Sequence, residues 1–160
     1  MRKMKIRKLR KGEEKEIWKL FYNTIRKINI KDYNENEIAA WAPDDFDINV
    51  AIKKFREIKP FVVITEGKII AYADIQPDGY IDHFYCHYNY QGQGIGSALF
   101  SVLEKEAKEK GILEMYSNVS ITARPFFEAM GFSVAKEQFL RMKDQKLKNY
   151  RMVRKNAIHS

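Results

Sequence analysis

The chain has 160 residues, of which 45% are hydrophobic and 13% aromatic, with 29 Lys or Arg against 21 Asp or Glu. This length and composition predict one globular domain, residues 1–160, whose core needs no metal or disulfide support. There is no run of 18 apolar residues and no apolar segment near residue 1, so we expect neither a membrane span nor a secretory signal, and a cytoplasmic protein. The only cysteine, Cys86, excludes an internal disulfide, and together with three histidines it makes no Cys/His metal site. We therefore predict no metal.

The positive charge lies at the two ends of the chain. Residues 1–31 hold 12 basic and 3 acidic residues, and residues 141–160 hold 7 and 1. The segment between them, residues 32–140, holds 10 basic and 17 acidic residues and contains every motif described below. This negative balance disfavours a groove that follows nucleic-acid phosphates. Binding of nucleic acid or an acidic protein through the basic ends is the alternative to two solvated basic faces.

The first half of the chain changes from helical to strand periodicity near residue 61. A short alternating segment predicts a strand at Lys5–Leu9, and apolar residues at steps of three and four predict an amphipathic helix over Glu13–Ile28. Two shorter helices are predicted at Asn34–Trp41 and Ile48–Ile58, separated by a break rich in Pro and Asp. Three successive antiparallel strands follow, at Phe61–Thr65, Lys68–Ile75 and Tyr80–His87.

The second half predicts two helices and a closing hairpin. Gly111 is a favoured stop for the first of these helices, and Thr122 is a candidate cap for the second. The order of elements predicts an α/β (α+β) fold, a mixed sheet with helices on its faces. The predicted elements are a helix at Gly92–Lys110, a strand at Met115–Val119, a helix from near Pro125 to Gly131, and strands at Phe132–Leu140 and Leu147–Val153.

A glycine-rich turn, Gln91-Gly-Gln-Gly-Ile-Gly-Ser97, joins a predicted strand to the strongest predicted helix. Glycines let a ligand approach the backbone, and the N–H groups at a helix N-terminus bind anions, so a phosphate or pyrophosphate fits here. The alternative is a tight strand-to-helix turn without a ligand. No Lys follows Gly96, which excludes a P-loop, and Ser97 stands where a dinucleotide fingerprint needs its third glycine.

Two stretches carry a resemblance to a known family. The pattern Gln91-x-x-Gly94-x-Gly96 after a strand resembles the acyl-coenzyme A signature of the GNAT superfamily of N-acetyltransferases. The segment Ser120–Phe132, which ends in Gly-Phe, resembles that superfamily's C-terminal motif. The resemblance implies a mostly antiparallel central sheet, flanked by helices and splayed between its fourth and fifth strands, with acetyl-coenzyme A in the cleft. The cofactor-binding residues that it implies are Phe84, Tyr85, Cys86, Gln91, Gly92, Gln93, Gly94, Ile95, Gly96, Ser97, Ser120 and Phe127.

Two positions depart from the usual superfamily pattern. Ser120 stands where Asn is usual, and Phe127 stands where a Tyr usually protonates the leaving thiolate. The combination of Ser120 with Phe126 and Phe127 resembles a bacterial subgroup of this superfamily. A thiolate with a pKa of about 8.5 can leave near neutral pH without a strong acid, so the loss of the Tyr is tolerable. Tyr85, Tyr116 and Tyr150 are unranked candidates for a replacement acid.

Acetyl transfer to an amine needs a proton acceptor and a donor for the developing oxyanion. We predict Asp82 as the base, because a partly buried carboxylate on the central strand can have a raised pKa. The alternative is a structural carboxylate paired with a cation or a backbone donor. His83 and His87 titrate in the useful range and are second candidates. The resemblance implies the backbone N–H near Cys86 as the oxyanion donor.

The sequence predicts an N-acetyltransferase that moves an acetyl group from acetyl-coenzyme A to a primary amine of a small molecule or peptide, by direct attack in a ternary complex. The alternative is a non-catalytic acyl-coenzyme A binding or regulatory module, which the missing Tyr favours. A homodimer is open. An acidic rim with one Trp would attract a cationic acceptor, and the alternative is an exposed helix with a buried Trp. The rim residues are Glu35, Glu37, Trp41, Asp44, Asp45 and Asp47.

Overall fold

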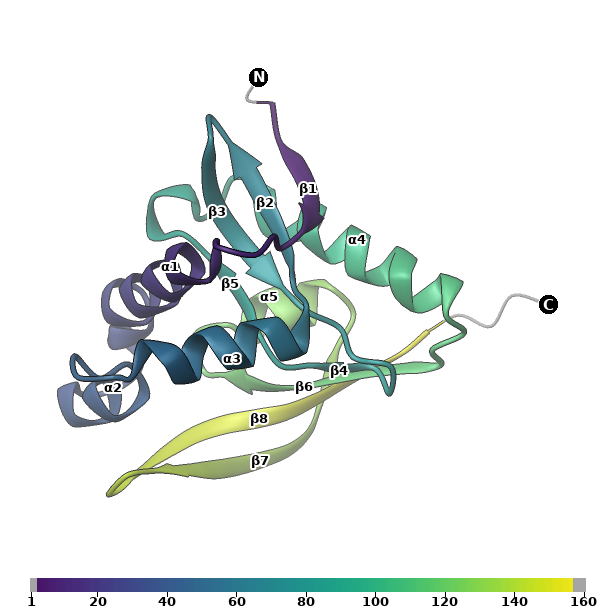
Figure 1. Ribbon diagram of the computed structural model, residues 1–160. Coiled ribbons are helices and arrows are strands. Elements are labelled where there is room, and N and C mark those ends of the chain that lie inside the picture. Colours follow the sequence, from purple (N-terminus) through teal and green to yellow (C-terminus); the bar gives the residue numbers. More distant parts are fainter. Residues whose placement is uncertain (1–2, 157–160) are drawn as a thin grey trace.

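The computed structural model describes residues 3–156 and arranges their strands in two sheets (Figure 1). Positions 1–2 and 157–160 of the expected domain, His159 among them, lie outside the described residues. The sheet orders are β1-β2-β3-β5 and β4-β6-β8-β7. The strands are β1 (Lys5–Lys8), β2 (Phe61–Thr65), β3 (Lys68–Ala73), β4 (Tyr80–Ile81), β5 (Phe84–Cys86), β6 (Glu114–Ser120), β7 (Ser133–Met142) and β8 (Gln145–Lys155).

Helices cover both faces of the first sheet. The helices are α1 (Glu14–Lys27), α2 (Glu35–Trp41), α3 (Ile48–Ile58), α4 (Ile95–Glu109) and α5 (Arg124–Ala129), with short 3-10 turns η1 (Asn29–Lys31) and η2 (Tyr88–Tyr90), and α2 and α5 contact strands of the second sheet. Figure 1 shows α1 and α3 on one side of β2 and β3, and α4 on the other. The mixed α/β class, with antiparallel sheets flanked by helices, is thereby confirmed.

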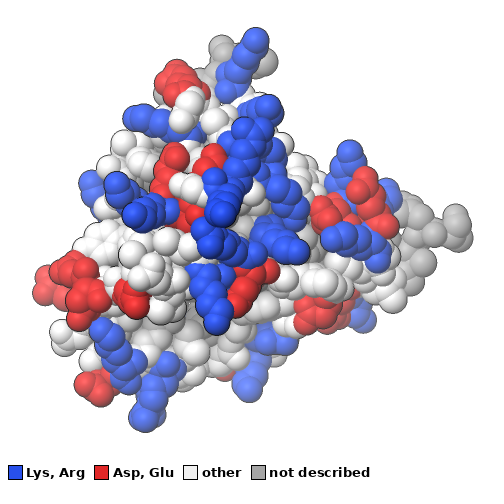
Figure 2. All heavy atoms as spheres, viewed as in Figure 1, with Lys and Arg blue, Asp and Glu red and all other residues white. Residues whose placement is uncertain are grey.

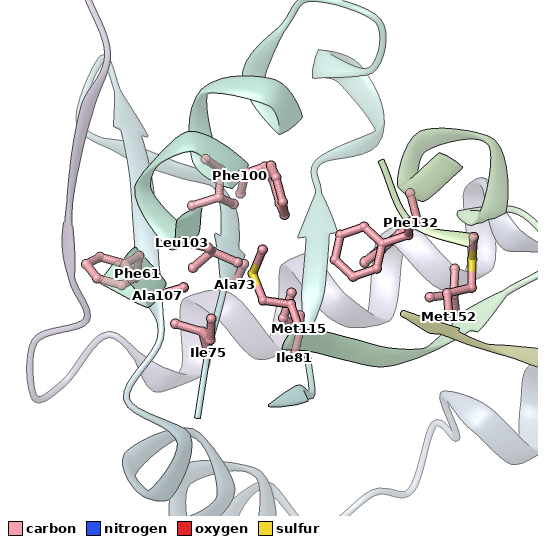
Figure 3. Packing of buried hydrophobic residues seen from close by; sticks show 14 of the residues in the cluster. Phe61, Ala73, Ile75, Ile81, Phe100, Leu103, Ala107, Met115, Phe132 and Met152 are labelled. Carbon is pink, nitrogen blue, oxygen red and sulfur yellow. The ribbon is translucent and has the colours of Figure 1, made fainter. Parts of the chain in front are cut away.

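The described residues form two hydrophobic cores, one on each face of the first sheet, because alternate side chains of a strand point to opposite faces. Phe61 and Val63 of β2 pack with Leu103 and other apolar residues of α4, whereas Val62 between them packs with the apolar stripe of α1. Figure 3 shows the first of these clusters, where side chains of α4 lie against residues of both sheets, among them Met115 of β6. This apolar contact holds the two sheets together.

The predicted strand Tyr80–His87 is wrong in one respect, because it divides at Asp82 and His83. β4 pairs parallel with β6, whereas β5 pairs antiparallel with β3. The buried Asp74 causes the division, since its Oδ1 accepts the backbone N–H groups of Asp82 at 3.0 Å and His83 at 2.6 Å. A side-chain carboxylate thus satisfies amides at the turn between the strands. From Phe84 onward β5 is separated from β6, as the expected splay requires.

Two helix starts also differ from their predictions. α4 begins at Ile95 rather than Gly92, because Gly92 and Gly94 have left-handed φ angles of 70° and 79°. Thr122 does not cap α5, since its hydroxyl donates to Asp32. No side chain among the described residues caps α5, and Ser120 Oγ accepts the N–H of Ala123, the residue before the helix, at 3.0 Å. The closing hairpin is longer than predicted, at Ser133–Met142 and Gln145–Lys155.

Acidic side chains neutralise part of the basic terminal segments. Figure 2 shows Lys and Arg interspersed with Asp and Glu on this face of the molecule. Near the N-terminus Arg7 forms a two-pronged pair with Glu13, and in β8 Arg154 pairs with Glu104 of α4. These pairs favour the interpretation of the basic ends as solvated faces rather than as one phosphate-binding surface.

Candidate active site

A cavity of about 420 Å³ opens between β5 and β6, beside the N-termini of α4 and α5. We call it the donor cavity. The predicted base and all the predicted cofactor-binding residues except Gln93 line it, and Gln93 instead donates from its side chain to the carbonyl of Asn89. The predicted residues that do line it are Asp82, Phe84, Tyr85, Cys86, Gln91, Gly92, Gly94, Ile95, Gly96, Ser97, Ser120 and Phe127.

The backbone of β5 directs hydrogen-bonding groups into the donor cavity. In an antiparallel pair, alternate residues turn their N–H and C=O groups toward the partner strand. His87 N donates to Ile70 O at 2.7 Å and Asp74 N donates to His83 O at 3.2 Å, so the odd-numbered residues face β3. The backbone groups of Phe84 and Cys86 therefore point away from β3, toward the gap that separates β5 from β6.

The glycines of the turn serve two different purposes. Gly92 and Gly94 have left-handed φ angles, and a Cβ at either position would have no atom within 4 Å. Their open side lies in the donor cavity, next to the amides that begin α4. At Gly96 a Cβ would lie 2.9 Å from the Phe126 ring, so this glycine allows α4 and α5 to pack closely.

Cys86 contributes a half-buried thiol and a carbonyl that accepts two hydrogen bonds. Burial raises the pKa of the thiol to about 11, so it is not a thiolate near neutral pH. Its carbonyl accepts from Gln91 Nε2 at 2.7 Å and from Thr24 Oγ1 at 3.3 Å. Gln91 thereby links the glycine-rich turn to β5, and Thr24 of α1 is hydrogen-bonded to the same carbonyl.

Of the three candidate tyrosines, only Tyr85 lines the donor cavity. The Tyr116 hydroxyl donates to Asp78, and Tyr150 is buried beneath Arg124. Burial raises the pKa of Tyr85, so this hydroxyl keeps its proton. Phe127 is 3% exposed and contacts the Phe84 ring edge-on, with the ring centroids 5.8 Å apart.

Asp82 also lies at the cavity wall, and its Oδ2 is 2.6 Å from Lys54 Nζ. This pair matches the structural alternative and leaves Oδ1 without a cation. His83 is buried, which lowers its pKa to about 4, and its Nδ1 lies 3.0 Å from the Tyr72 hydroxyl. His87 accepts the N–H of Asn89 and lies outside the donor cavity.

Sequence reasoning missed Asp74, a fully buried carboxylate at the end of β3. Burial raises its pKa to about 6, in spite of hydrogen bonds from Gln76 and from the Asp82–His83 backbone that favour the ionised form. The sequence feature that could have identified Asp74 is its place as the one carboxylate in the mostly apolar segment Lys68–Ile75.

A second cavity of about 240 Å³ adjoins the first, and we call it the acceptor cavity. Both cavities are lined by Trp41, Asp82, Tyr85, Asn118 and Ser120. Of the predicted rim, Trp41 reaches the walls, while the rim carboxylates line neither cavity. Asp47 caps α3, Glu37 belongs to the capping box of α2, and Asp44 contacts Tyr22 and Arg26.

Several lining residues had no motif that could have revealed them. Thr24, Ile28 and Asn29 arrive from α1 and the turn after it, and Ser117 and Asn118 from β6. The buried Asn29 donates to Ser120 Oγ at 3.4 Å across 91 positions of sequence. Such contacts depend on the packing of α1 against the sheets.

Among residues 3–156, no group of three or more His, Cys, Asp or Glu side chains could hold a metal ion. Over the same range, no helix is both long and apolar enough to cross a membrane.

The profile of the acetyltransferase (GNAT) domain matches residues 29–152, a span that contains the glycine-rich turn and both motif stretches. This chain belongs to the GNAT family. It is 27% identical over 138 residues to the uncharacterized N-acetyltransferase YafP of Escherichia coli (strain K12), covering 86% of this chain and 87% of YafP.

Solved GNAT structures share the fold. A GCN5-related N-acetyltransferase from Rhodopseudomonas palustris superimposes with a TM-score of 0.91 at 24% identity, over 98% of both chains. YncA of Salmonella typhimurium, a putative acetyltransferase solved with its cofactor acetyl-CoA, superimposes with a TM-score of 0.70 at 19% identity, over 98% of this chain and 96% of its own. The GNAT family and an acyltransferase activity are therefore assigned to the chain.

Proposed function

We propose that this GNAT protein transfers the acetyl group of acetyl-coenzyme A directly to a primary amine, with both substrates bound at once. The observation that carries the proposal is the junction of two cavities. The donor cavity begins at the glycine-rich turn, the acceptor cavity lies beyond it, and the two share Asp82, Tyr85 and Ser120. Two substrates can therefore meet there without either one leaving.

The donor cavity fits acetyl-coenzyme A in two respects. The open side of Gly92 and Gly94, beside the first amides of α4, suits a pyrophosphate. The outward-facing backbone groups of Phe84 suit an amide of a pantetheine arm, which can pair with β5 in place of a strand. The acetyl-CoA that YncA binds is the same class of ligand.

When bound, acetyl-coenzyme A supplies a thioester whose carbonyl carbon forms a bond with the amine nitrogen as the C–S bond breaks and the thiol leaves. The Cys86 N–H, which points away from β3, is the proposed donor to the carbonyl oxygen as negative charge develops there. Tyr85 lines both cavities and its hydroxyl keeps its proton, so we propose it as the donor to the leaving sulfur.

Asp82 is the proposed proton acceptor for the amine. An alkyl amine with a pKa of about 10.4 arrives protonated and must lose a proton before it attacks. The Asp82 carboxylate lies where the cavities join, and its Oδ1 is 4.0 Å from the His83 Nε2. His83 with its pKa of about 4 is neutral near pH 7 and leaves the carboxylate free to accept that proton, directly or through water.

Direct attack is favoured over an acyl-enzyme intermediate by the state of Cys86. The thiol is the only cysteine side chain in the sequence, and a pKa of about 11 leaves little thiolate near pH 7. Initial rates measured over a grid of acetyl-coenzyme A and amine concentrations should therefore give intersecting double-reciprocal lines. Parallel lines would indicate the two-step route instead.

The test of the proposal combines calorimetric titration of acetyl-coenzyme A with thiol release against a panel of primary amines. We expect binding and amine-dependent thiol release by the natural chain. Binding without release from any amine would favour the non-catalytic module, and absence of binding would reject the donor cavity.

Two variants separate the base from its salt bridge. If Asp82 accepts the proton, Asp82→Asn should bind acetyl-coenzyme A normally and lose about 10²- to 10⁴-fold in turnover. Lys54→Met breaks the same pair but keeps the carboxylate, so it should retain turnover within about 10-fold. Equal losses in the two variants would show that only the ion pair matters.

The proposal includes a cytoplasmic location, supported by a single cysteine that cannot form an internal disulfide. A homodimer stays a prediction.

A further inference from the structure

The residues that line the acceptor cavity indicate which class of amine it binds. This inference rests on the proposed function. Aromatic rings dominate these walls. Phe21 and Tyr85 meet edge-on with centroids 5.0 Å apart, and Tyr33 and Trp41 meet in the same way at 5.5 Å. The lining residues are Phe21, Tyr33, Trp41, Tyr80, Asp82, His83, Tyr85, Asn118, Ser120, Leu140, Met142, Leu147 and Asn149.

No Lys or Arg is among these lining residues. His83 is neutral because its pKa is lowered to about 4, and burial keeps the phenols of Tyr33 and Tyr85 protonated. The one ionised group on the wall is the Asp82 carboxylate, with Lys54 behind it at 2.6 Å. An anionic substituent on the acceptor would therefore be desolvated without a free cation to pair with.

Asn149 supplies an unused polar group. It is 9% exposed and lines the cavity from β8, directly opposite Ser120 of β6. Its Oδ1 is buried and has no hydrogen-bond partner among the described residues. A buried amide oxygen without a partner is costly, so a donor from a bound molecule would stabilise it. An amine N–H at the cavity junction is such a donor.

Asn118 and Ser120 complete the polar side of the wall, the closing hairpin adds apolar side chains, and the space is limited. Leu140, Met142 and Leu147 approach from the closing hairpin, opposite the rings of α1 and α2. A volume of about 240 Å³ lies below the range of about 300–1,000 Å³ for drug-sized ligands. The occupant is thus a small molecule with an apolar body rather than a polypeptide segment.

We propose that the acceptor is a small primary amine with an apolar, ring- or branch-bearing body and no anionic group, held at its nitrogen by Asn149 and Asp82. The rings attract the incoming ammonium group by cation–π contact, and the body fills the space between Trp41 and the closing hairpin. Free amino acids and acidic peptides are excluded by their carboxylates.

The experiment compares 2-phenylethylamine, phenylalanine and phenylalaninamide as acceptors. Phenylalaninamide has the bulk of phenylalanine without the negative charge of its carboxylate. We expect kcat/KM to fall at least about 10-fold from 2-phenylethylamine to phenylalanine, and phenylalaninamide to retain most of the activity. Ethylamine should be at least about 10-fold poorer than 2-phenylethylamine, because it leaves the apolar walls uncovered. Equal or better use of phenylalanine, or a loss with the amide as large as with the acid, would overturn the proposal.

A binding arm distinguishes failure of this inference from failure of the proposed function. The same three compounds are titrated into protein saturated with coenzyme A, which reports the preference even where turnover is absent. If acetyl-coenzyme A binds and some amine is acetylated, but phenylalanine binds as well as the other two compounds, only the substrate class is wrong. Without any acetyl-coenzyme A binding, both are wrong.

Asn149→Leu tests the polar contact. It should raise the KM for 2-phenylethylamine about 10-fold and leave the Kd for acetyl-coenzyme A unchanged. The matched control is Asn156→Leu, which also removes an amide with a buried, unpartnered Oδ1 but lies outside both cavities. Equal KM values in Asn149→Leu and the natural chain would overturn the assignment of Asn149.

Discussion

The donor and acceptor cavities share a junction but are built from different parts of the chain. The donor side depends on backbone: the left-handed Gly92 and Gly94, the first amides of α4, and the outward-facing groups of β5. The acceptor side depends on side chains from α1, α2, β4, β6 and the closing hairpin. A backbone site is sensitive to added atoms and tolerant of lost ones, whereas a side-chain site shows the reverse.

The largest effect expected from this difference is at Gly94. In Gly94→Val the new side chain enters the open space beside the α4 amides, so we predict at least a 100-fold weaker Kd for acetyl-coenzyme A, measured by calorimetry. Left-handed Val is itself strained by about 1–2 kcal/mol, so thermal unfolding is followed in the same sample.

Gly67→Val is the matched control for Gly94→Val. Gly67 has a similar φ of 74°, and a Cβ added there would also have no atom within 4 Å, but it lies in the β2–β3 turn, outside both cavities. It should lose similar stability and keep its affinity. A comparable loss of affinity in both variants would mean that strain, not blocked approach, weakens binding.

A second effect concerns the carboxylate that shapes the acceptor side. The pKa of Asp74 is raised from 3.8 to about 6. Between pH 3.8 and pH 6 the Asp74 carboxyl is therefore protonated in the folded protein and ionised in the unfolded chain. Stability from this group is present below about pH 4 and is lost as the pH rises through 6. The loss is about 3 kcal/mol.

Asp74→Asn removes this titration. The free energy of unfolding of the variant, relative to the natural chain, should rise by about 3 kcal/mol between pH 4 and pH 7, whatever its value at pH 4. Urea unfolding at a series of pH values measures this difference, from which the contribution of His83 cancels. A difference that does not change with pH would show that Asp74 is ionised throughout this range.

The smallest effect is expected at Cys86, on the donor side. Cys86→Ala removes the thiol but keeps the backbone N–H that is proposed to face the thioester carbonyl. We predict kcat within about 3-fold of the natural chain, measured by thiol release at saturating substrates. A loss of 100-fold or more would assign a chemical role to the thiol and contradict direct attack.

The donor side was largely predictable because its signal is local. Glycines at Gly92 and Gly94 mark left-handed backbone, and their position before a strong helix places them at its N-terminus. The residues predicted from this signal and from the family resemblance line one cavity, with Gln93 as the exception. The division of the strand at Asp82 was not predictable, because it depends on hydrogen bonds to a side chain eight residues earlier.

The sequence by itself determined the periodicities and the glycine turn, since each depends on neighbours within one or two helical turns. These local terms are enough for the α/β class and for the place of the donor site. Only the tertiary structure decided which carboxylate is buried, that Asn149 is left without a partner beside Ser120, and that Trp41 alone of the expected rim reaches the cavity. The physical reason is that burial and desolvation are set by segments far apart in the chain, which become neighbours only when α1, α2 and the closing hairpin pack against the sheets.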